Sequence, residues 1–383
     1  MQNNLRLDFL KRIRLATKKK HNLKLHEPKL FNDFSKVKEC IKNNFVAKGK
    51  YIQIFENELK KFTKSKYVIG VSSGTAGLHL ALKSLGIKNN EEVLVPALTF
   101  VATANVIKYI NAIPHFIDSD EKNLGVDAEK LKNYLNSSQF IFKKYLINKK
   151  SKRKVTALIV THVFGHIGEI IKLKKLCKKY NLKLIEDATE ALGSKFLKKH
   201  AGTFGDIGVL SFNGNKIITT GGGGAILTNK LNLFNKARHL AQVAKKKHEY
   251  EFIHDELGYN YRIPNINAAL GCSQLKRLNT FIKKKRKLFS NYNLYFSNVK
   301  YLSLFKEPKN CKSNYWLQTV ILKKKFANFK YQFIKFSKLK NIETRPVWKL
   351  LSNLKYFKNC PSMNLDNSKS LEKRIINIPS NEF

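Results

Sequence analysis

The chain has 383 residues and a formal net charge of +46 at neutral pH. This length exceeds what one simple core needs, so it predicts a large catalytic domain with a smaller second domain. The charge alone would indicate a nucleic acid or an anionic membrane as partner. However, the lysines are spread along the whole chain among Asn, Ile and Phe residues, in runs such as KKK (18–20), KKLCKKY (174–180) and KKKRK (283–287). We interpret these runs as solvated surface in a sequence that drifted toward A/T-rich codons, which leaves a basic surface suited to a phosphate-bearing substrate.

The cysteines and the N-terminus narrow the cellular setting. The five cysteines form no CxxC pair, so they predict neither a zinc site nor a disulfide framework. The basic N-terminus, MQNNLRLDFLKRIRLATKKK, lacks the apolar core of a signal peptide, and no stretch is long and apolar enough to span a bilayer. We expect a cytoplasmic protein without stable membrane insertion, whose N-terminal helix packs on the protein's own body.

From about residue 66 the chain alternates short apolar runs with helical stretches, which predicts an α/β domain with a mostly parallel central sheet. The expected strands are 67–71, 92–96, 113–118, 155–163, 182–187, 209–213 and 225–229, and the expected helices are 75–85, 102–109, 170–180 and a long one over 266–287. We predict an N-terminal segment (1–40), a large domain (41–275) and a small C-terminal α/β domain (276–383). In such folds the chemistry gathers at the strand ends along one edge of the sheet.

The first chemical motif is SSGTAGLHLAL (72–82), which follows a strand and opens a helix. Backbone N–H groups and the positive end of the helix dipole make this turn a site for a phosphate. It is neither a Walker loop nor a dinucleotide fingerprint, because the required Lys and the spaced glycines are absent. An ordinary Ser/Thr helix cap is the alternative interpretation.

The second motif, LKLIEDATEALGS (182–194), places Glu186 and Asp187 at the end of an apolar strand. A buried carboxylate is costly without a cationic partner, and the protonated ring nitrogen of pyridoxal phosphate would supply one. A helix N-cap or a metal ligand is the alternative role for Asp187.

The third motif, GVLSFNGNKIITTGGGGAILTN (208–229), holds Lys216 in a loop between two strands. Ser211, Asn213 and Asn215 precede it and four glycines follow, so the surroundings are apolar and glycine-rich rather than lysine-rich. A chain that bends this sharply beside one amine indicates close approach to a ligand. The amine could then act as nucleophile and proton carrier, although a surface lysine is the default in so basic a chain.

Taken in this order, the motifs resemble the fold type I pyridoxal-phosphate enzymes, and within them the DegT/StrS family of nucleotide-sugar aminotransferases. The resemblance covers about residues 25 to 380 and includes EEVLVPALTFVATANVI (91–107), IPHFIDSD (113–120), THVFGH (161–166), LGYNYRIPNINAALGCSQL (257–275), SNYWL (313–317) and TRPVW (344–348). LHEPKLF (25–31) and SFNGNKIITTGGGG are most similar to the branch associated with legionaminic-acid-type sugars. That branch aminates C4 of a nucleotide-linked 4-keto-6-deoxy-N-acetylhexosamine.

The resemblance implies roles for the residues around the cofactor. Lys216 would form the Schiff base, Asp187 would pair with the ring nitrogen and Phe100 would stack on the ring. Glu190 stands where many relatives carry Gln or His near the 3′ oxygen of the cofactor, so its role is open. The residues that would complete the cofactor site, mainly around the phosphate, are Gly74, Thr75, Ser211 and Asn213.

The resemblance also implies a homodimer with shared active sites. In the family the GYNYR segment reaches into the site of the neighbouring subunit, where Asn260 would contact the phosphate and Arg262 an anionic group of the substrate. Arg345 and Trp348 would approach the sugar nucleotide. The aromatic residues of NYNLYF (291–296) and YWL (315–317) are expected in the core, with contact to a nucleobase as the alternative.

The residue type at position 216 favours one reaction. Relatives with His at the Schiff-base position are dehydratases, so Lys216 favours transamination with L-glutamate as donor and 2-oxoglutarate as product. A sugar dehydratase, a 3-keto-sugar aminotransferase and a basic polyanion-binding protein without activity are the alternatives. His162 and His166 have a spacing that can bind metal on a helix, but Gly165 and the strand-end position argue against a metal site.

Overall fold

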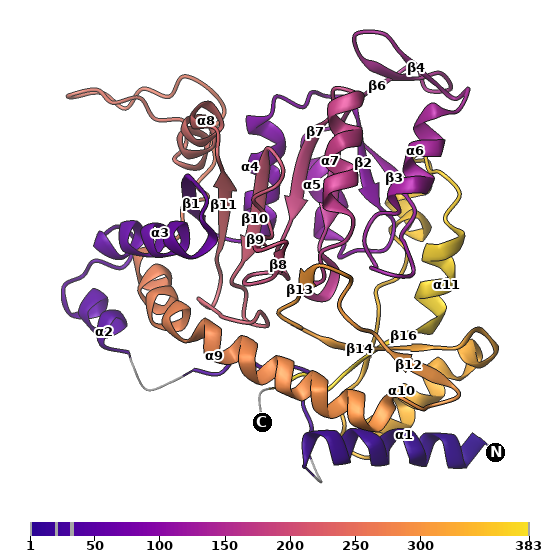
Figure 1. Ribbon diagram of the computed structural model, residues 1–383. Coiled ribbons are helices and arrows are strands. Elements are labelled where there is room, and N and C mark those ends of the chain that lie inside the picture. Colours follow the sequence, from indigo (N-terminus) through magenta and orange to yellow (C-terminus); the bar gives the residue numbers. More distant parts are fainter. Residues whose placement is uncertain (1, 20–21, 31–33, 382–383) are drawn as a thin grey trace.

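The computed structural model describes residues 2–19, 22–30 and 34–381. Phe31, the last residue of the LHEPKLF motif, lies outside this part. Figure 1 shows a large sheet in the upper part of the molecule and a small sheet at the C-terminal end, joined by the long helix α9 (Asn265–Phe296). The predicted fold class, α/β with a mostly parallel central sheet and a smaller C-terminal α/β part, is confirmed.

The central sheet has a parallel middle and antiparallel edges. The parallel strands lie in the order β10-β7-β6-β2-β3, β11 and β1 pair antiparallel beside β10, and the β4–β5 hairpin pairs beside β6. The strands in chain order are β1 (Tyr67–Val71), β2 (Glu92–Pro96), β3 (Ile113–Ile117), β4 (Phe140–Phe142), β5 (Leu146–Asn148), β6 (Lys154–Thr161), β7 (Lys183–Asp187), β10 (Ile207–Ser211) and β11 (Gly224–Thr228). The strands β2, β10 and β11 are buried along their whole length, and β6 and β7 are buried after their first residue, as continuous apolar runs predict.

Helices between the strands cover the sheet and aim their N-termini at its carboxyl edge, where the chemistry was expected. They are α4 (Gly74–Ser84), α5 (Ala102–Tyr109), α6 (Ala128–Asn136) and α7 (Ile170–Lys179). The helix α8 (Leu231–Ala241) follows the antiparallel strand β11 and begins at the opposite edge, and α2 (Ser35–Lys42) and α3 (Lys50–Thr63) precede β1. Each predicted strand and helix of this region is present, with ends that differ by no more than two residues. A short sheet of β13 (Cys311–Lys312), β8 (Lys195–Phe196) and β9 (Lys199–His200) ties the C-terminal part to the segment after β7.

The C-terminal part is an antiparallel sheet in the order β12-β14-β16-β15 with two helices. Its elements are β12 (Leu302–Leu304), β14 (Gln318–Leu322), α10 (Lys330–Leu339), β15 (Arg345–Pro346), α11 (Asp366–Arg374) and β16 (Ile375–Ile378). The helix α1 (Gln2–Thr17) lies along α9 and buries Phe9 and Ile13 against Tyr292 and Phe333 (Figure 1). The expectation that the N-terminal helix packs on the protein's own body is therefore confirmed.

The helix α9 is longer than predicted and runs unbroken through the proposed boundary between residues 275 and 276. It continues to Phe296 because Leu288, Tyr292 and Phe296 repeat at helical spacing and pack in a second hydrophobic cluster with α1 and the small sheet. Its first half packs in the cluster of the central sheet.

The interpretation of KKKRK (283–287) on α9 as solvated surface holds for Lys283, Lys284 and Lys287, which are exposed, but is wrong for Lys285. Lys285 is fully buried, and Arg286 forms an ion pair with Glu307. A helix that crosses the middle of the molecule buries one face, and residue 285 lies on that face. No helix in the described part of the chain is long and apolar enough to cross a membrane.

Candidate active site

A cavity of about 370 Å³ opens at the carboxyl edge of the central sheet, between the end of β7, the start of α4 and the loop after β10. Segments of the C-terminal part close its far wall. The structure brings ten of the predicted site residues together here: Gly74, Thr75, Phe100, Asp187, Glu190, Ser211, Asn213, Lys216, Arg345 and Trp348. Their convergence follows from parallel strands whose carboxyl ends meet at one edge.

Asp187 ends β7 with its carboxylate buried in this cavity. Its Oδ2 accepts a hydrogen bond from the hydroxyl of Thr103 (2.7 Å), and its Oδ1 accepts from the hydroxyl of Thr189 (2.7 Å). These donors fix the carboxylate in one orientation and leave it without a cationic side chain at hydrogen-bond distance among the described residues. Thr103 and Thr189 are site residues that sequence reasoning missed, although an Asp whose carboxylate accepts from the backbone amide two residues on, as Asp187 does from Thr189, is a known turn pattern.

Behind Asp187, Glu186 and His162 form a buried pair. His162 Nε2 lies 2.9 Å from Glu186 Oε2, and the amides of Gly202, Phe204 and Gly205 donate to the same carboxylate. Burial opposes ionisation of Glu186, but His162 and the backbone amides outweigh it and lower the pKa of this carboxyl. The pair supports the strand end and does not line the cavity.

The turn before α4 has the form of an anion cradle. Ser73 caps the helix, accepting at Oγ from the amide of Ala76 (3.0 Å). A Cβ at Gly74 would lie 3.0 Å from both Ser211 Cβ and Thr189 Cγ2, so only glycine fits without displacing them. Free helix N–H groups therefore face the cavity beside the hydroxyl side chains of Thr75 and Ser211.

Lys216 lies on the opposite side of the cavity, with 13% of its side chain exposed. Its Nζ is 3.6 Å from Glu190 Oε1 and 4.1 Å from the ring centroid of Trp316. Burial raises the pKa of Glu190 to about 7, against the opposing effect of Lys216 and of the Phe164 amide, which donates to Oε2 (2.8 Å). A lysine and a carboxyl that titrates near neutrality thus share one desolvated site, an arrangement suited to proton transfer.

Aromatic side chains form the rest of the wall. Phe100 is half exposed at the mouth, and Trp348 stacks on Phe164 with ring centroids 5.1 Å apart. Trp316, expected in the core as part of YWL, is buried and also lines the cavity beneath Lys216. Its contribution was missed because nothing near it in the sequence links it to a lysine loop one hundred residues earlier.

Asn260 and Arg262 do not reach this cavity in their own chain. They line a separate one of about 460 Å³ with Lys48, Lys245 and His248. The segment pairs with the start of the SSGT turn through Ser72, whose amide donates to Tyr261 O (2.8 Å). His162 and His166 also diverge: His162 bonds to Glu186, whereas His166 packs between Phe305 and Tyr315, where burial lowers its pKa to about 3.

The fold and this lysine-centred pocket define an enzyme of the aminotransferase type. The chain belongs to the DegT/DnrJ/EryC1/StrS aminotransferase family, whose model matches residues 31–382. The predicted family and the predicted enzyme class are therefore confirmed.

Three similar proteins illustrate the relationship. A GDP-perosamine synthase of Escherichia coli O157:H7 is 37% identical over 313 residues, which are 82% of this chain and 80% of that protein. A UDP-4-amino-4,6-dideoxy-N-acetyl-beta-L-altrosamine transaminase of Campylobacter jejuni is 34% identical over 295 residues, 76% of this chain and 74% of the relative. The solved structure of Helicobacter pylori PseC, an aminotransferase involved in the biosynthesis of pseudoaminic acid, superposes with a TM-score of 0.85 at 24% identity, covering 94% of this chain and 93% of PseC.

Proposed function

We propose that this protein is a pyridoxal-phosphate-dependent transaminase. It converts a nucleotide-linked 4-keto-6-deoxy-N-acetylhexosamine to the 4-amino sugar with L-glutamate as donor. The observation that carries the proposal is the meeting of Lys216, Glu190 and Asp187 in one buried pocket beside a helix N-terminus. Lysine at position 216 favours transamination over dehydration, because its primary amine can both bind a carbonyl carbon and carry a proton.

The residues present fit pyridoxal phosphate. The α4 turn presents its helix N-terminus to the cavity, and Gly74, Thr75 and Ser211 line the cavity beside it, which suits a phosphate group. Asn213 lies next to this cradle, where its amide reaches Ser211 Oγ. Asp187 is a buried anion suited to a protonated ring nitrogen, and Phe100 offers a ring face at the mouth. When bound, the cofactor supplies an electron sink for carbanion chemistry.

The chain's own groups then orient the reactants and move protons. Lys216 Nζ would take the proton from the α-carbon of the amino donor and deliver it to the cofactor, and in the second half-reaction it would take a proton back from the cofactor and deliver it to the sugar carbon that gains the amine. Glu190, which has a pKa of about 7, stabilises the positive charge on Lys216 Nζ when it is ionised. Because this pKa is near neutral, Glu190 can also accept a proton from Nζ or donate one to it. Arg345 and Trp348 approach the nucleotide sugar from the C-terminal wall.

Two relatives support a nucleotide-linked sugar as substrate, and the name of one of them specifies a 4-amino sugar. One of them is named as a transaminase for a UDP-linked 4-amino-4,6-dideoxy-N-acetyl sugar and the other as a GDP-perosamine synthase. Both names specify a nucleoside diphosphate, which suits the basic surface of this chain. We therefore place the reaction in the cytoplasmic biosynthesis of a legionaminic-acid-like or other surface-glycan sugar.

The test uses purified protein with pyridoxal phosphate, followed by borohydride reduction and mass analysis of the peptide that contains Lys216. We expect the cofactor on Lys216, and 2-oxoglutarate when L-glutamate and a UDP- or GDP-linked 4-keto sugar are both present. Lys216→Ala should lose both signals, a loss of about 1,000-fold or more in activity. Native protein that neither captures the cofactor nor forms 2-oxoglutarate would contradict the proposal. Formation of 2-oxoglutarate with a 3-keto sugar but not with a 4-keto sugar would change the proposed substrate class.

We further propose a homodimer whose active sites are shared. In this arrangement Asn260 and Arg262 act in the pocket of the partner, which is consistent with their absence from the pocket of their own chain. Lys216→Ala and Arg262→Ala chains should each be inactive alone. Mixed during refolding, they should regain about a quarter of native activity, because half of the dimers contain one intact site. No recovery on mixing would assign Arg262 to its own subunit.

A further inference from the structure

The loop that carries Lys216 is held by two side chains from distant parts of the sequence. The indole N–H of Trp316 donates to Asn215 O (2.9 Å), and His26 Nε2 lies 3.2 Å from Lys216 O. Two consecutive carbonyls of the loop are therefore fixed from outside it. Because peptide geometry is rigid, fixing both carbonyls restricts where the Lys216 side chain begins.

A single buried ammonium joins these two anchors. Lys285 Nζ on α9 donates to Trp316 O (3.0 Å) and to Ser380 O (2.7 Å), and lies 3.3 Å from His26 Nδ1. Burial lowers the pKa of His26 well below its usual value, and nearby Lys285 adds to this effect. The ring is thus neutral, so Nδ1 accepts from Lys285 and the hydrogen on Nε2 is available for Lys216 O.

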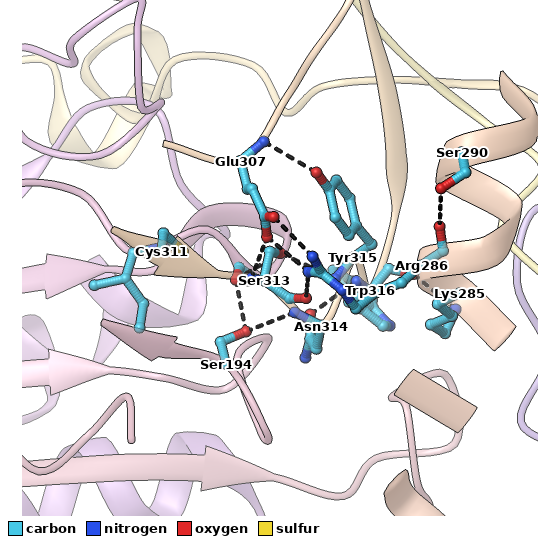
Figure 2. A network of polar contacts seen from close by, with 12 residues as sticks. Ser194, Lys285, Arg286, Ser290, Glu307, Cys311, Ser313, Asn314, Tyr315 and Trp316 are labelled. Carbon is cyan, nitrogen blue, oxygen red and sulfur yellow. Dashed lines mark hydrogen bonds and ion pairs between the residues drawn. The ribbon is translucent and has the colours of Figure 1, made fainter. Parts of the chain in front are cut away.

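Trp316 is fixed on its other side as well. Its amide donates to Asn314 Oδ1 (2.9 Å), and the Asn314 amide donates to Ser194 Oγ (3.0 Å). Figure 2 shows these contacts beside the ion pair of Arg286 with Glu307, which also binds the neighbouring Ser313. Trp316 is therefore held at both its backbone and its indole N–H, and the face of its ring lies toward Lys216 Nζ.

We propose that Lys285, His26 and Trp316 form a lysine clamp that positions the amine of Lys216 for reaction. The proposal rests on the proposed function, in which Lys216 is the reacting amine. The members of the lysine clamp are positioning residues, since they act through the loop and the ring face. A buried lysine suits this task because its three N–H donors can serve several acceptors at once, whereas a hydrophobic side chain of similar length can serve none.

The experiment measures how fast a small acylating reagent modifies Lys216 in the full-length chain after removal of bound cofactor. Trp316→Phe keeps an aromatic ring but removes the indole donor, and Lys285→Met removes the ammonium. In both variants we expect Lys216 to react about two- to fivefold faster, because its amine leaves the ring face and the Glu190 carboxylate. Exposed Lys230, which pairs with Asp206, supplies an internal rate standard in the same digest.

Tyr315→Phe is the matched control. It removes the hydroxyl that accepts from the Glu307 amide (3.1 Å), a contact in the same segment that does not reach the loop. This control should leave the labelling rate of Lys216 unchanged even if it lowers stability. In steady-state assays the two clamp variants should lose about tenfold in kcat with little change in KM for L-glutamate, because positioning affects the reacting geometry more than binding.

The double variant Lys285→Met/Trp316→Phe should equal Lys285→Met alone if the members act as one unit, whereas additive effects would contradict the lysine clamp. Native labelling rates in Trp316→Phe would also overturn it, and this variant carries the test if Lys285→Met does not fold. Failure of the native chain to capture the cofactor would overturn the proposed function instead, so the two failures are distinguishable.

Discussion

Two buried glutamates, Glu186 and Glu190, lie on either side of Asp187 in sequence and meet opposite environments. Glu186 accepts hydrogen bonds from three backbone amides and pairs with His162. Glu190 accepts from one amide, that of Phe164, and faces Lys216 at 3.6 Å. Burial acts on both, yet the pKa of Glu186 falls whereas that of Glu190 rises to about 7.

The opposite pKa shifts of the two glutamates show which of them can take part in proton transfer. The carboxylate of Glu186 is saturated with donors, so it remains ionised and supports the strand end. The carboxyl of Glu190 has fewer donors and is buried, so it holds its proton more tightly than an ordinary glutamate and exchanges it near neutral pH. Glu186 therefore stabilises the end of β7, whereas Glu190 can exchange a proton in the cavity, and Asp187 lies between them in the sequence.

The largest effect is expected from Glu186→Gln. The new side-chain NH2 group would face backbone N–H groups that need an acceptor, and His162 would lose its carboxylate partner. Breaking such a buried pair typically costs about 3–5 kcal/mol. Urea unfolding measures the loss, and Glu129→Gln, which removes exposed ion pairs with Lys132 and Lys172, serves as control with less than about 1 kcal/mol expected. Equal losses of unfolding free energy in Glu186→Gln and Glu129→Gln would contradict the structural role given to Glu186.

Glu190→Gln should change stability in a pH-dependent way. The folded pKa of about 7 lies above the ordinary value of 4.5, so the folded chain binds its proton more tightly than the unfolded chain. Native stability therefore falls as pH rises from about 4.5 to about 7, by a total on the order of 3 kcal/mol. The glutamine variant escapes this loss.

Urea unfolding of the native chain and of Glu190→Gln at about pH 5 and about pH 8.5 tests this expectation. The two proteins should match at the lower pH, and the variant should be more stable at the higher pH. A difference that does not depend on pH would show that Glu190 does not titrate between these values.

Sequence alone predicted the part of the site that follows from strand order. Asp187, Lys216 and the SSGT turn each stand beside a strand end, and parallel strands bring such ends together. The donors that complete the site come from elsewhere in the chain. Lys285 looked like any other residue of a basic run, and only the path of α9 through the molecule shows that its face is buried. Trp316 donates to Asn215 O only because the fold brings these distant segments together, and no local sequence pattern predicts that contact.

The smallest effect is expected from Thr189→Val, which tests how Asp187, the residue between the two glutamates, is held in place. The substitution keeps the shape of the side chain and the backbone amide contact to Asp187, but removes the hydroxyl that donates to Oδ1 at 2.7 Å. Because Thr103 still donates to Oδ2, we expect a loss of about 1–2 kcal/mol, near the lower end of what one hydrogen bond to a charged group contributes.

The measurement pairs urea unfolding with the retention of pyridoxal phosphate during dialysis. If Asp187 holds the ring nitrogen, the freed lone pair should loosen the carboxylate and speed cofactor loss, whereas Thr63→Val, which removes a hydroxyl bonded to Leu59 O within α3, should lower stability without that effect. Equal retention of the cofactor in both variants would mean that Thr103 and the end of β7 alone orient Asp187. In that case Thr189 would have no part in cofactor binding, and the reactive groups that distinguish the site would be Glu190 and Lys216.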